Sequence, residues 1–476
     1  MGRVAGVLVF LGVAFIPSGL HQLEGFGRRP AYAAAVAAWM AVWWLTEAVP
    51  IALTACLPLV AFPLLGVFGK GFGGDVMAAA EPFVDPYIFL FMGGMALGAA
   101  MEQTNLHRRV ALHIMRVIGT RPKQLLLGIL VATAAISMWI SNTATAVMMM
   151  PIGMALLAQL AVTTGRARLD WFGCSVMLAV AYGANVGGIG TKIGTGTNSI
   201  FCGFVADVLK RDIGFLEYVA IGTPFVVLFI PLAWAALWRV GRKDQLPDVQ
   251  AGEIIDAELR KMGAMTSGER TVATIFLLAA FLWIFADPIR GVVTPLLKSM
   301  WPTLKFQGKH YEAVVAMGAG LLCLATRTLD TQGLKRVPWS TLLLLGGSFA
   351  MAAGMEGSGL SSWMAAHLKS IVDMPLIAQL ALASFSSVFL SAVASNTATI
   401  NVLINVMPRN LLLLAAATIG SSCDFALPAG TPPNAIVFGS GYVRLPVMMR
   451  AGFVLDLVAA AVITLYAYLY LPLLLG

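Results

Sequence analysis

Long apolar stretches, separated by short polar segments, run along almost the whole chain. Segments of about 18 or more residues with few charges are typical of helices that cross a lipid bilayer. The pattern predicts an all-α polytopic membrane protein with about eleven transmembrane helices. Their expected positions are 4–20, 31–49, 51–68, 86–104, 170–190, 216–238, 269–287, 311–327, 338–356, 410–428 and 450–474.

Two charge-free tracts, residues 124–165 and 374–408, differ from these spans because each carries a cluster of small polar residues. The first cluster is Ser-Asn-Thr-Ala-Thr at 141–145, and the same five residues recur at 395–399. Polar groups at membrane depth are costly unless they find partners. We therefore expect each tract to form a re-entrant hairpin with the polar cluster at its tip. Two complete spans in place of a hairpin would leave the flanking loops on the same side, so the loop charges alone keep that alternative open.

The two halves of the chain match at further positions. Two glycines at 93–94 correspond to two at 346–347, and Met-Glu pairs follow at 101–102 and 355–356. Each half is expected to contain three spans and one hairpin, and an odd number of spans turns the second copy upside down in the membrane. The sequence therefore predicts an inverted repeat, an arrangement of many secondary transporters in which the substrate site lies between the copies.

A second kind of interruption follows each polar cluster. Residues 187–198 read GGIGTKIGTGTN and residues 428–434 read PAGTPPN. Glycine and proline at this density cannot continue a helix. Broken helices leave free N–H groups at one end, which attract anions, and free carbonyl groups at the other, which attract cations. Small polar residues also hold membrane helices together, but their repetition beside paired breaks favours a site for an anion flanked by cations.

Composition excludes several other classes of protein. The chain is 59% hydrophobic and 11% charged, and its net charge of +8 is expected to lie in cytoplasmic loops rather than to serve a nucleic-acid partner. The five cysteines are scattered without metal-binding spacing, and the sequence has no HExxH, GxSxG or pair of intramembrane aspartates. We therefore expect no enzymatic activity and no cofactor. A channel would usually present several equivalent pore helices, whereas two inverted halves with broken helices favour a transporter.

Three motifs carry a resemblance to a known family: Thr-Glu-Ala-Val-Pro at 46–50, the two polar clusters, and GTPPNAIVFGSG at 430–441. With them the chain resembles members of the divalent anion:sodium symporter family over essentially its whole length. The resemblance implies a multi-pass protein of the inner (plasma) membrane, a homodimeric elevator-type transporter with a fixed scaffold and a mobile transport domain. It implies scaffold segments at 1–120 and 216–373, transport segments at 121–215 and 374–449, and a last transmembrane helix at 450–476.

The resemblance also implies roles for individual residues at the clusters and breaks. Substrate carboxylates would contact Ser141, Asn142, Thr143, Thr195, Ser395, Asn396, Thr397, Thr431 and Pro432. One sodium ion would bind Ser137, Ser141, Asn142 and Gly194, and a second would bind Ser391, Ala394, Asn396 and Gly430. The implied function is sodium-coupled transport of a small dianion, a C4-dicarboxylate such as succinate, malate or fumarate. Sodium-independent dicarboxylate exchange, and transport of citrate or sulfate, stay open because Ser, Asn and Thr bind carboxylate and sulfate oxygens alike.

Two charges distinguish this chain from that pattern. Lys192 lies inside the first break, where its ammonium is expected either to replace a sodium ion or to extend to the membrane surface. Asp424 lies just before the second break. Three roles are open for it: an ion pair with Lys192, titration during transport, or a place in an aqueous vestibule. The first break also reads Gly-Thr-Gly-Thr-Asn, where many relatives have a proline before the asparagine.

Overall fold

The computed structural model describes residues 2–21, 23, 25–247, 252–301, 303 and 306–475, and over these residues the chain is helical without a β-strand, as the apolar pattern predicts. In the first half the α-helices are α1 (Gly2–Phe15), α2 (Arg29–Thr46), α3 (Ile51–Ala55), α4 (Leu57–Leu65), α5 (Gly71–Ala80), α6 (Pro86–Gln103), α7 (Leu106–Ile118), α8 (Pro122–Ser137), α9 (Asn142–Thr163), α10 (Asp170–Gly188), α11 (Gly196–Val208), α12 (Phe215–Gly241) and α13 (Gly252–Met262). In the second half they are α14 (Ser267–Ile284), α15 (Ala286–Met300), α16 (Gly308–Ala325), α17 (Thr331–Lys335), α18 (Trp339–Gly357), α19 (Leu360–His367), α20 (Lys369–Val372), α21 (Leu376–Val393), α22 (Asn396–Val406), α23 (Leu411–Gly420), α24 (Pro432–Phe438), α25 (Leu445–Leu469) and α26 (Leu471–Leu475). Short 3-10 turns occur at Gly19–His21, Glu81–Val84 and Arg242–Asp244.

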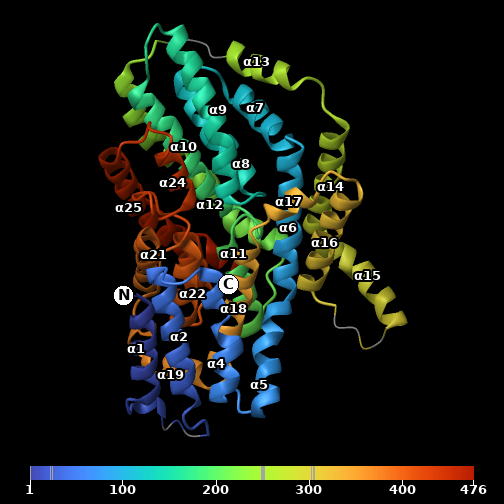
Figure 1. The fold of residues 1–476 in the computed structure, drawn as a ribbon, viewed down its shortest axis with the longest axis vertical. Helices are drawn as coiled ribbons and strands as arrows, with labels where there is room; N and C mark the ends of the chain where they lie inside the picture. The colour runs from blue at the N-terminus through green and yellow to red at the C-terminus, as the bar shows by residue number, and fades with distance from the viewer. Residues whose placement is uncertain are drawn as a thin grey trace.

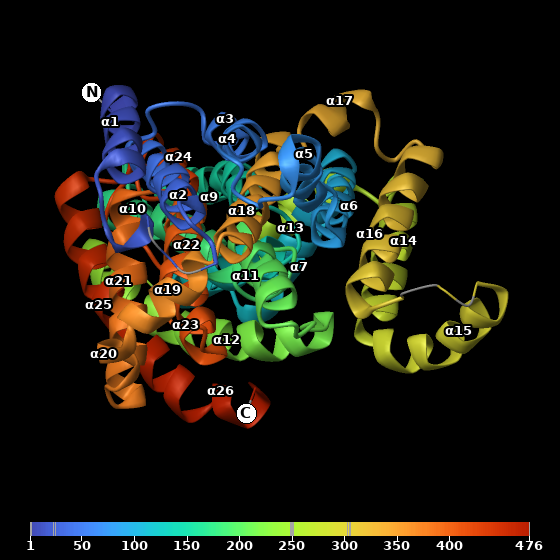
Figure 2. The same ribbon diagram turned by 90° about the horizontal axis from the view of Figure 1, so that it is seen from below.

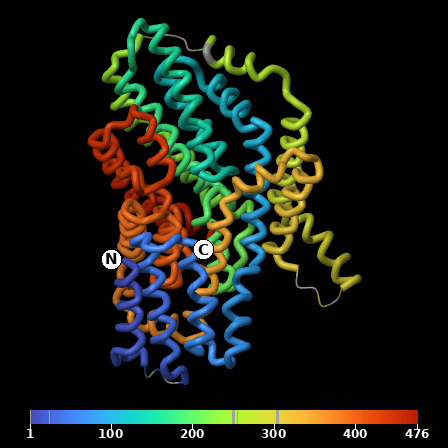
Figure 3. Tube along the Cα trace, in the orientation of Figure 1, coloured from blue at the N-terminus to red at the C-terminus, as the bar shows by residue number. Residues whose placement is uncertain are grey.

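The two expected hairpins lie in different parts of the molecule (Figure 1). In this view α8 and α9 lie above α21 and α22, and α14, α15 and α16 form a group on one side. Seen from below, the same group stays at one edge, opposite α21 and α25 (Figure 2). The trace in Figure 3 shows the N-terminal helices α1 to α5 gathered at one end. The helices that carry the polar clusters and breaks belong to neither of these groups.

Each polar cluster starts a new helix, which is why each charge-free tract is divided in two. α8 ends at Ser137 and α9 begins at Asn142, while α21 ends at Val393 and α22 begins at Asn396. A serine precedes each new helix as its N-cap, and its hydroxyl oxygen accepts the backbone N–H of the third helical residue. Serine prefers this position because the first turn of a helix leaves its N–H groups unpaired. The interruption predicted from the sequence is therefore present in both tracts.

The second pair of interruptions divides α10 from α11 and α23 from α24. The first begins after Gly188, close to the expected position, and ends at Thr195, the N-cap of α11. The second is longer than predicted: the expected span 410–428 is wrong at its end, because α23 stops at Gly420. Its carbonyl and amide groups find other partners there, since the Ser421 carbonyl accepts a hydrogen bond from Ser391 and the Phe425 N–H donates to Asp456. Neither of these backbone groups is therefore free to continue the helix.

Close backbone contacts explain part of the glycine content. A methyl group on Gly183 of α10 would lie 2.8 Å from the carbonyl oxygen of Leu130, and one on Gly187 would collide with the backbone of Ala134. Small residues that let helix backbones approach are the usual means of packing helices in membranes. The first broken helix is therefore held tightly against α8.

By length and composition, six helical segments of the described chain are long and apolar enough to cross a membrane: Gly71–Gln103, Asn142–Thr163, Phe215–Asp244, Ser267–Ile284, Leu376–Val393 and Leu445–Leu469. Shorter apolar helices include Gly2–Phe15, Ile51–Leu65, Pro122–Ser137 and Leu411–Gly420. The total of about eleven spans stays a prediction. The sequence analysis expected no separate helix at α5, which lies between expected spans, or at α15, which begins at the end of the expected span 269–287.

The polar segment between α12 and α14 is partly helical. It contains α13, which packs against α7 through ion pairs from Arg108 to Glu258 at 2.7 Å and from Arg116 to Asp256 at 3.0 Å. Hydrogen bonds from Lys261 and Arg108 lower the pKa of the Glu258 carboxyl group. The segment is therefore attached by ion pairs as well as by apolar burial, since Ile255 of α13 is 0% exposed and belongs to the main hydrophobic core.

Candidate functional site

The ends of the two hairpins share one hydrogen-bond pattern. In the first, the Ser137 hydroxyl donates to the Ala184 carbonyl at 2.7 Å and lies 2.9 Å from the amide oxygen of Asn142. In the second, the Ser391 hydroxyl donates to the Ser421 carbonyl at 2.6 Å and lies 3.2 Å from the amide oxygen of Asn396. A serine at the end of one helix thus joins the hairpin tip to the neighbouring broken helix in both halves.

The tips are accessible, although their surroundings are buried. Ser141 caps Ala144 N at 3.4 Å, and Ser395 caps Ala398 N at 3.3 Å. The side chains of the first Ser-Asn-Thr cluster are half-buried or exposed, and those of the second are half-buried. The N-terminus of a helix carries partial positive charge and free N–H groups, which attract anions. Each tip therefore presents neutral hydrogen-bond donors at a position that favours negative charge.

The two breaks also share a pattern, in which an asparagine amide holds two carbonyl groups of the unwound chain. Asn198 Nδ2 donates to Gly188 O at 2.8 Å and to Thr191 O at 2.7 Å. Asn434 Nδ2 donates to Asp424 O at 3.1 Å and to Leu427 O at 3.0 Å. In the repeat, Gly188 therefore corresponds to Asp424, and Thr191 corresponds to Leu427.

Contacts between the halves bring the breaks together. Asn185 of α10 donates from Nδ2 to Thr431 Oγ1 at 3.0 Å and lies 3.3 Å from Asn434 Oδ1. A second contact between the halves joins the hydroxyl groups of Thr197 and Ser422, which lie 3.3 Å apart. Each hairpin helix also packs on the broken helix of the other half, α9 on α24 and α22 on α11. The motifs of both halves therefore converge on one region.

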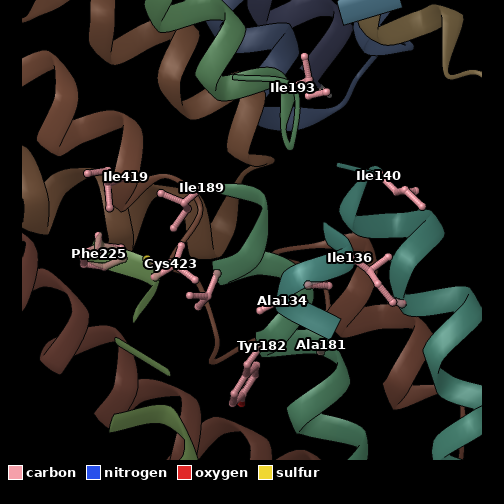
Figure 4. Close-up of a cluster of buried hydrophobic side chains, with 14 of the residues drawn as sticks. Ala134, Ile136, Ile140, Ala181, Tyr182, Ile189, Ile193, Phe225, Ile419 and Cys423 are labelled. Carbon is pink, nitrogen blue, oxygen red and sulfur yellow. The ribbon is translucent and has the colours of Figure 1, made fainter. Parts of the chain in front are cut away.

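Apolar side chains surround this region (Figure 4). They come from α8 and its following turn, from α10, α12 and α23, and from the breaks themselves; the labelled ones are Ala134, Ile136, Ile140, Ala181, Tyr182, Ile189, Ile193, Phe225, Ile419 and Cys423. The Tyr182 hydroxyl satisfies the Phe425 carbonyl of the second break at 3.0 Å. Polar groups within such an apolar shell interact more strongly than they would in water.

Lys192 points away from the second break. Its side chain is 0% exposed, and its ammonium pairs with Glu312 of α16 at 2.6 Å. The other oxygen of Glu312 accepts the Phe215 N–H at 2.6 Å, and the ring of Tyr87 lies 5.0 Å from the ammonium. Two expectations for Lys192 are therefore wrong: it neither reaches the membrane surface nor pairs with Asp424, because α16 supplies an acid beside the break.

Asp424 has no such partner. It is 1% exposed, and within the described chain neither of its carboxylate oxygens has a hydrogen-bond partner. Its neighbour Phe425 donates its N–H to Asp456 of α25 at 2.7 Å, and the second oxygen of Asp456 is also unpartnered. The structure shows no ion pair with Lys192, which is paired with Glu312 instead, and the burial of Asp424 excludes a place in an aqueous vestibule. The third expected role, a protonation change during transport, stays a prediction.

The remaining predicted residues lie where the breaks begin their second helices. Thr195 and Thr431 are the N-caps of α11 and α24, Pro432 is exposed at the start of α24, and Gly194 and Gly430 precede the two caps. Ala394 is buried at the end of α21. Their assigned contacts with substrate and sodium stay predictions.

The sequence analysis missed several residues of this region. Asn185 joins the two halves, and Asn198 and Asn434 hold their own breaks. The sequence marks the last two only as the ends of the interrupted segments. The hydroxyls of Thr145 and Thr399 are buried without a partner in the described structure. Both close the repeated five-residue clusters, so the repeat itself was a signal for them. Glu312 had a weaker signal, since it is the one acid in the expected span 311–327.

Comparison with known sequences identifies the family. The chain matches the family model described as the sodium:sulfate symporter transmembrane region over residues 1–476. It is 33% identical to proteins named sodium-dependent dicarboxylate transporter SdcS from Staphylococcus saprophyticus and from Staphylococcus aureus. Each alignment covers 100% of this chain and 92% of the relative. The resemblance to divalent anion:sodium symporters is thereby confirmed.

Solved structures support the fold alone. The YdaH transporter of Alcanivorax borkumensis superposes with a TM-score of 0.57 at 12% identity, over 91% of this chain and 98% of that one. The MtrF efflux pump of Neisseria gonorrhoeae superposes with a TM-score of 0.54 at 10% identity, over 98% of this chain and 94% of that one. These matches show a fold shared with solved transporters. The family match and the long apolar helices show that this chain is an integral membrane protein. Because the family model matches residues 1–476, this chain belongs to the family described as the sodium:sulfate symporter transmembrane region.

Proposed function

We propose that this protein is a secondary active transporter that couples the uptake of dicarboxylates, C4-dicarboxylates in particular, to sodium in the plasma membrane. The observation that carries the proposal is the duplicated pattern of tip and break, with each tip helix packed on the broken helix of the other half. The names of the relatives, which are sodium-dependent dicarboxylate transporters, support the same substrate and coupling ion.

A dianion with two carboxylates suits a site made of two similar halves. One carboxylate binds at the tip of the first hairpin, to Ser141, Asn142 and Thr143, and the other at the tip of the second, to Ser395, Asn396 and Thr397. Thr195, Thr431 and Pro432 line the site where α11 and α24 begin. The tips offer neutral donors and helix N-termini, which attract negative charge without cancelling it.

Sodium ions balance the negative charge of the dianion, which the neutral donors do not cancel. The first ion binds near Ser137, Ser141 and Asn142 with the backbone of Gly194, and the second near Ser391, Asn396 and the backbone of Ala394 and Gly430. Hydroxyl, amide and carbonyl oxygens are the ligands that hard cations prefer. The asparagine of each tip touches both an ion and the anion, so binding of the substrate and of sodium depend on each other.

Transport proceeds by movement of segments 121–215 and 374–449 against segments 1–120 and 216–373, within each subunit of a homodimer. The inverted repeat implies that the two hairpins open toward opposite sides of the membrane. Lys123 and Asp373 are exposed beside the first residues of α8 and α21. In a background without native cysteines, Lys123→Cys should be labelled from the cytoplasm and Asp373→Cys from outside by an impermeant maleimide. Labelling of both from one side contradicts the inverted arrangement.

The test of the function is uptake of radiolabelled succinate by purified protein in liposomes. An inward sodium gradient is expected to drive accumulation, and an equal potassium gradient is not. Unlabelled malate and fumarate should compete, whereas sulfate and citrate should compete weakly. Exchange of internal for external succinate that does not depend on sodium would overturn the coupling, and sodium-driven sulfate uptake without succinate uptake would overturn the substrate.

A further inference from the structure

Asp424 is the buried charge that the proposed function leaves unexplained. Both of its carboxylate oxygens lack a hydrogen-bond partner in the described structure, and the residue is 1% exposed. Ionised carboxylates in an apolar surrounding are costly unless a cation or several hydrogen bonds compensate them. The buried carboxyl group is therefore compensated either by a proton or by a cation, and no side chain of the described chain pairs with it to supply that cation.

The charged groups near Asp424 make the requirement stronger. The acid with the largest electrostatic effect on Asp424 is Asp456 of α25. One oxygen of Asp456 accepts the Phe425 N–H, and the other has no hydrogen-bond partner in the described structure. Cys423 beside it is buried and free. Lys192, the buried cation of the first break, is held by Glu312 instead. The second break thus brings two acids together, with no basic side chain paired to Asp424 among the described residues.

The Asp424 side chain is directed at the proposed second sodium site. A methyl group on Gly430 would lie 2.6 Å from Asp424 Oδ2 and 3.3 Å from the Ala392 carbonyl oxygen. The carboxylate therefore borders Gly430, which contributes backbone to that site, and Gly430 itself lies against the end of α21, which carries Ser391. Gly430 has no side chain to separate them.

The repeat gives independent support for this direction. Asn198 and Asn434 identify Gly188 as the counterpart of Asp424. A methyl group on Gly188 would collide with the amide oxygen of Asn142, the residue at the tip of the first hairpin. A side chain at this position of the repeat therefore points toward the hairpin tip of its own half, which in the second half is Asn396.

We propose that the Asp424 carboxylate is a direct ligand of a sodium ion at the second break, together with oxygens of Ser391, Asn396 and Gly430. The inference rests on the proposed function and assigns to one of its two sites a charged ligand that the other lacks. A full negative charge attracts a cation more strongly than carbonyl and hydroxyl dipoles do, above all in a site of low dielectric constant. The second site is therefore the tighter of the two and fills before the substrate binds.

The experiment measures sodium binding and transport separately in the wild type and in Asp424→Asn, which keeps the size of the side chain and removes the charge. Asp287→Asn is the matched control, because its side chain is 86% exposed on α15. Purified protein in detergent is titrated with sodium chloride, with choline chloride at equal ionic strength, and the melting temperature is followed. Uptake of succinate into liposomes is then measured against sodium concentration, and against pH in sodium-free buffer.

We expect Asp424→Asn to raise the sodium concentration for half-maximal stabilisation by at least about tenfold, the loss of about 1.4 kcal/mol of binding free energy. Asp287→Asn should match the wild type. If the wild type responds to sodium and Asp424→Asn responds equally, the inference is overturned while the proposed function stands. If the substitution instead abolishes a pH dependence and leaves the sodium response intact, Asp424 carries a proton, which also overturns it. A wild type without any sodium response overturns both proposals. Should Asp424→Asn not fold, Asp424→Gly, which installs the residue found at the corresponding position of the first break, is titrated in its place.

Discussion

The two breaks of this transporter share one backbone frame and differ in their charges. Both are held by an asparagine that spans two carbonyl groups, and both are joined to a hairpin by a serine. In the first break Gly188 has no side chain, and Lys192 is paired with Glu312. In the second, Asp424 stands at the place of Gly188 without a partner. The repeat has therefore kept the geometry of the site and changed its electrostatics.

The difference between a paired and an unpaired charge indicates different roles. Both charges of the Lys192–Glu312 pair have partners within the protein. One oxygen of Glu312 binds the Lys192 ammonium, and the other accepts the Phe215 N–H. Such a pair joins the first break to α16 and needs no ligand. The Asp424 carboxylate is incomplete until a cation arrives. A fixed charge therefore stabilises the fold at one break, and a variable charge couples binding at the other.

The largest effect is expected when the complete pair is broken. Glu312→Leu should destabilise the protein by about 3–5 kcal/mol, because it leaves the Lys192 ammonium buried without a partner. Asp424→Asn should not destabilise, since it removes a charge that has no partner in the protein. The measurement is thermal unfolding in detergent. The double variant Lys192→Met with Glu312→Leu is the control and should recover most of the loss. Equal losses from Glu312→Leu and Asp424→Asn would remove the distinction between the breaks.

The next effect tests the symmetry of the two hairpin tips that accompany the breaks. Asn142→Ala and Asn396→Ala should each reduce succinate uptake by about a hundredfold, because each removes hydrogen bonds to charged groups worth about 1.5–3 kcal/mol. Surface expression and melting temperature serve as measures of folding. Gln159→Ala, at an exposed position of α9, is the control and should transport normally. Unchanged uptake by both tip variants would contradict the site.

The smallest effect concerns an ion pair at the surface. Arg409, which follows α22, pairs with Glu356 of α18, and both side chains are exposed. Arg409→Ala should change the free energy of unfolding by no more than about 1 kcal/mol, because water screens such pairs. A loss as large as that of Glu312→Leu would mean that burial is not what distinguishes the Lys192 pair.

The sequence predicted the parts of the site that depend on local chemistry. The repeated Ser-Asn-Thr clusters predicted two helix starts, and the glycines and prolines predicted two breaks, since these residues act through their own backbone. The partner of Lys192 was not predictable in the same way, because Glu312 reaches it only when α16 packs beside the break. The early end of α23 at Gly420 also depends on distant partners, Ser391 and Asp456, which compete for its backbone groups. The apolar residues of α23 itself gave no signal for this early end.

The most direct test of the account is the number of sodium ions carried with each dicarboxylate. In liposomes holding a fixed sodium gradient, the succinate gradient at which net flux stops gives this number. Two sites of like geometry, one in each half, predict that the limiting succinate ratio rises with at least the square of the sodium ratio. A limiting ratio that follows the first power, or that ignores sodium, would contradict a site built from two ion-binding halves.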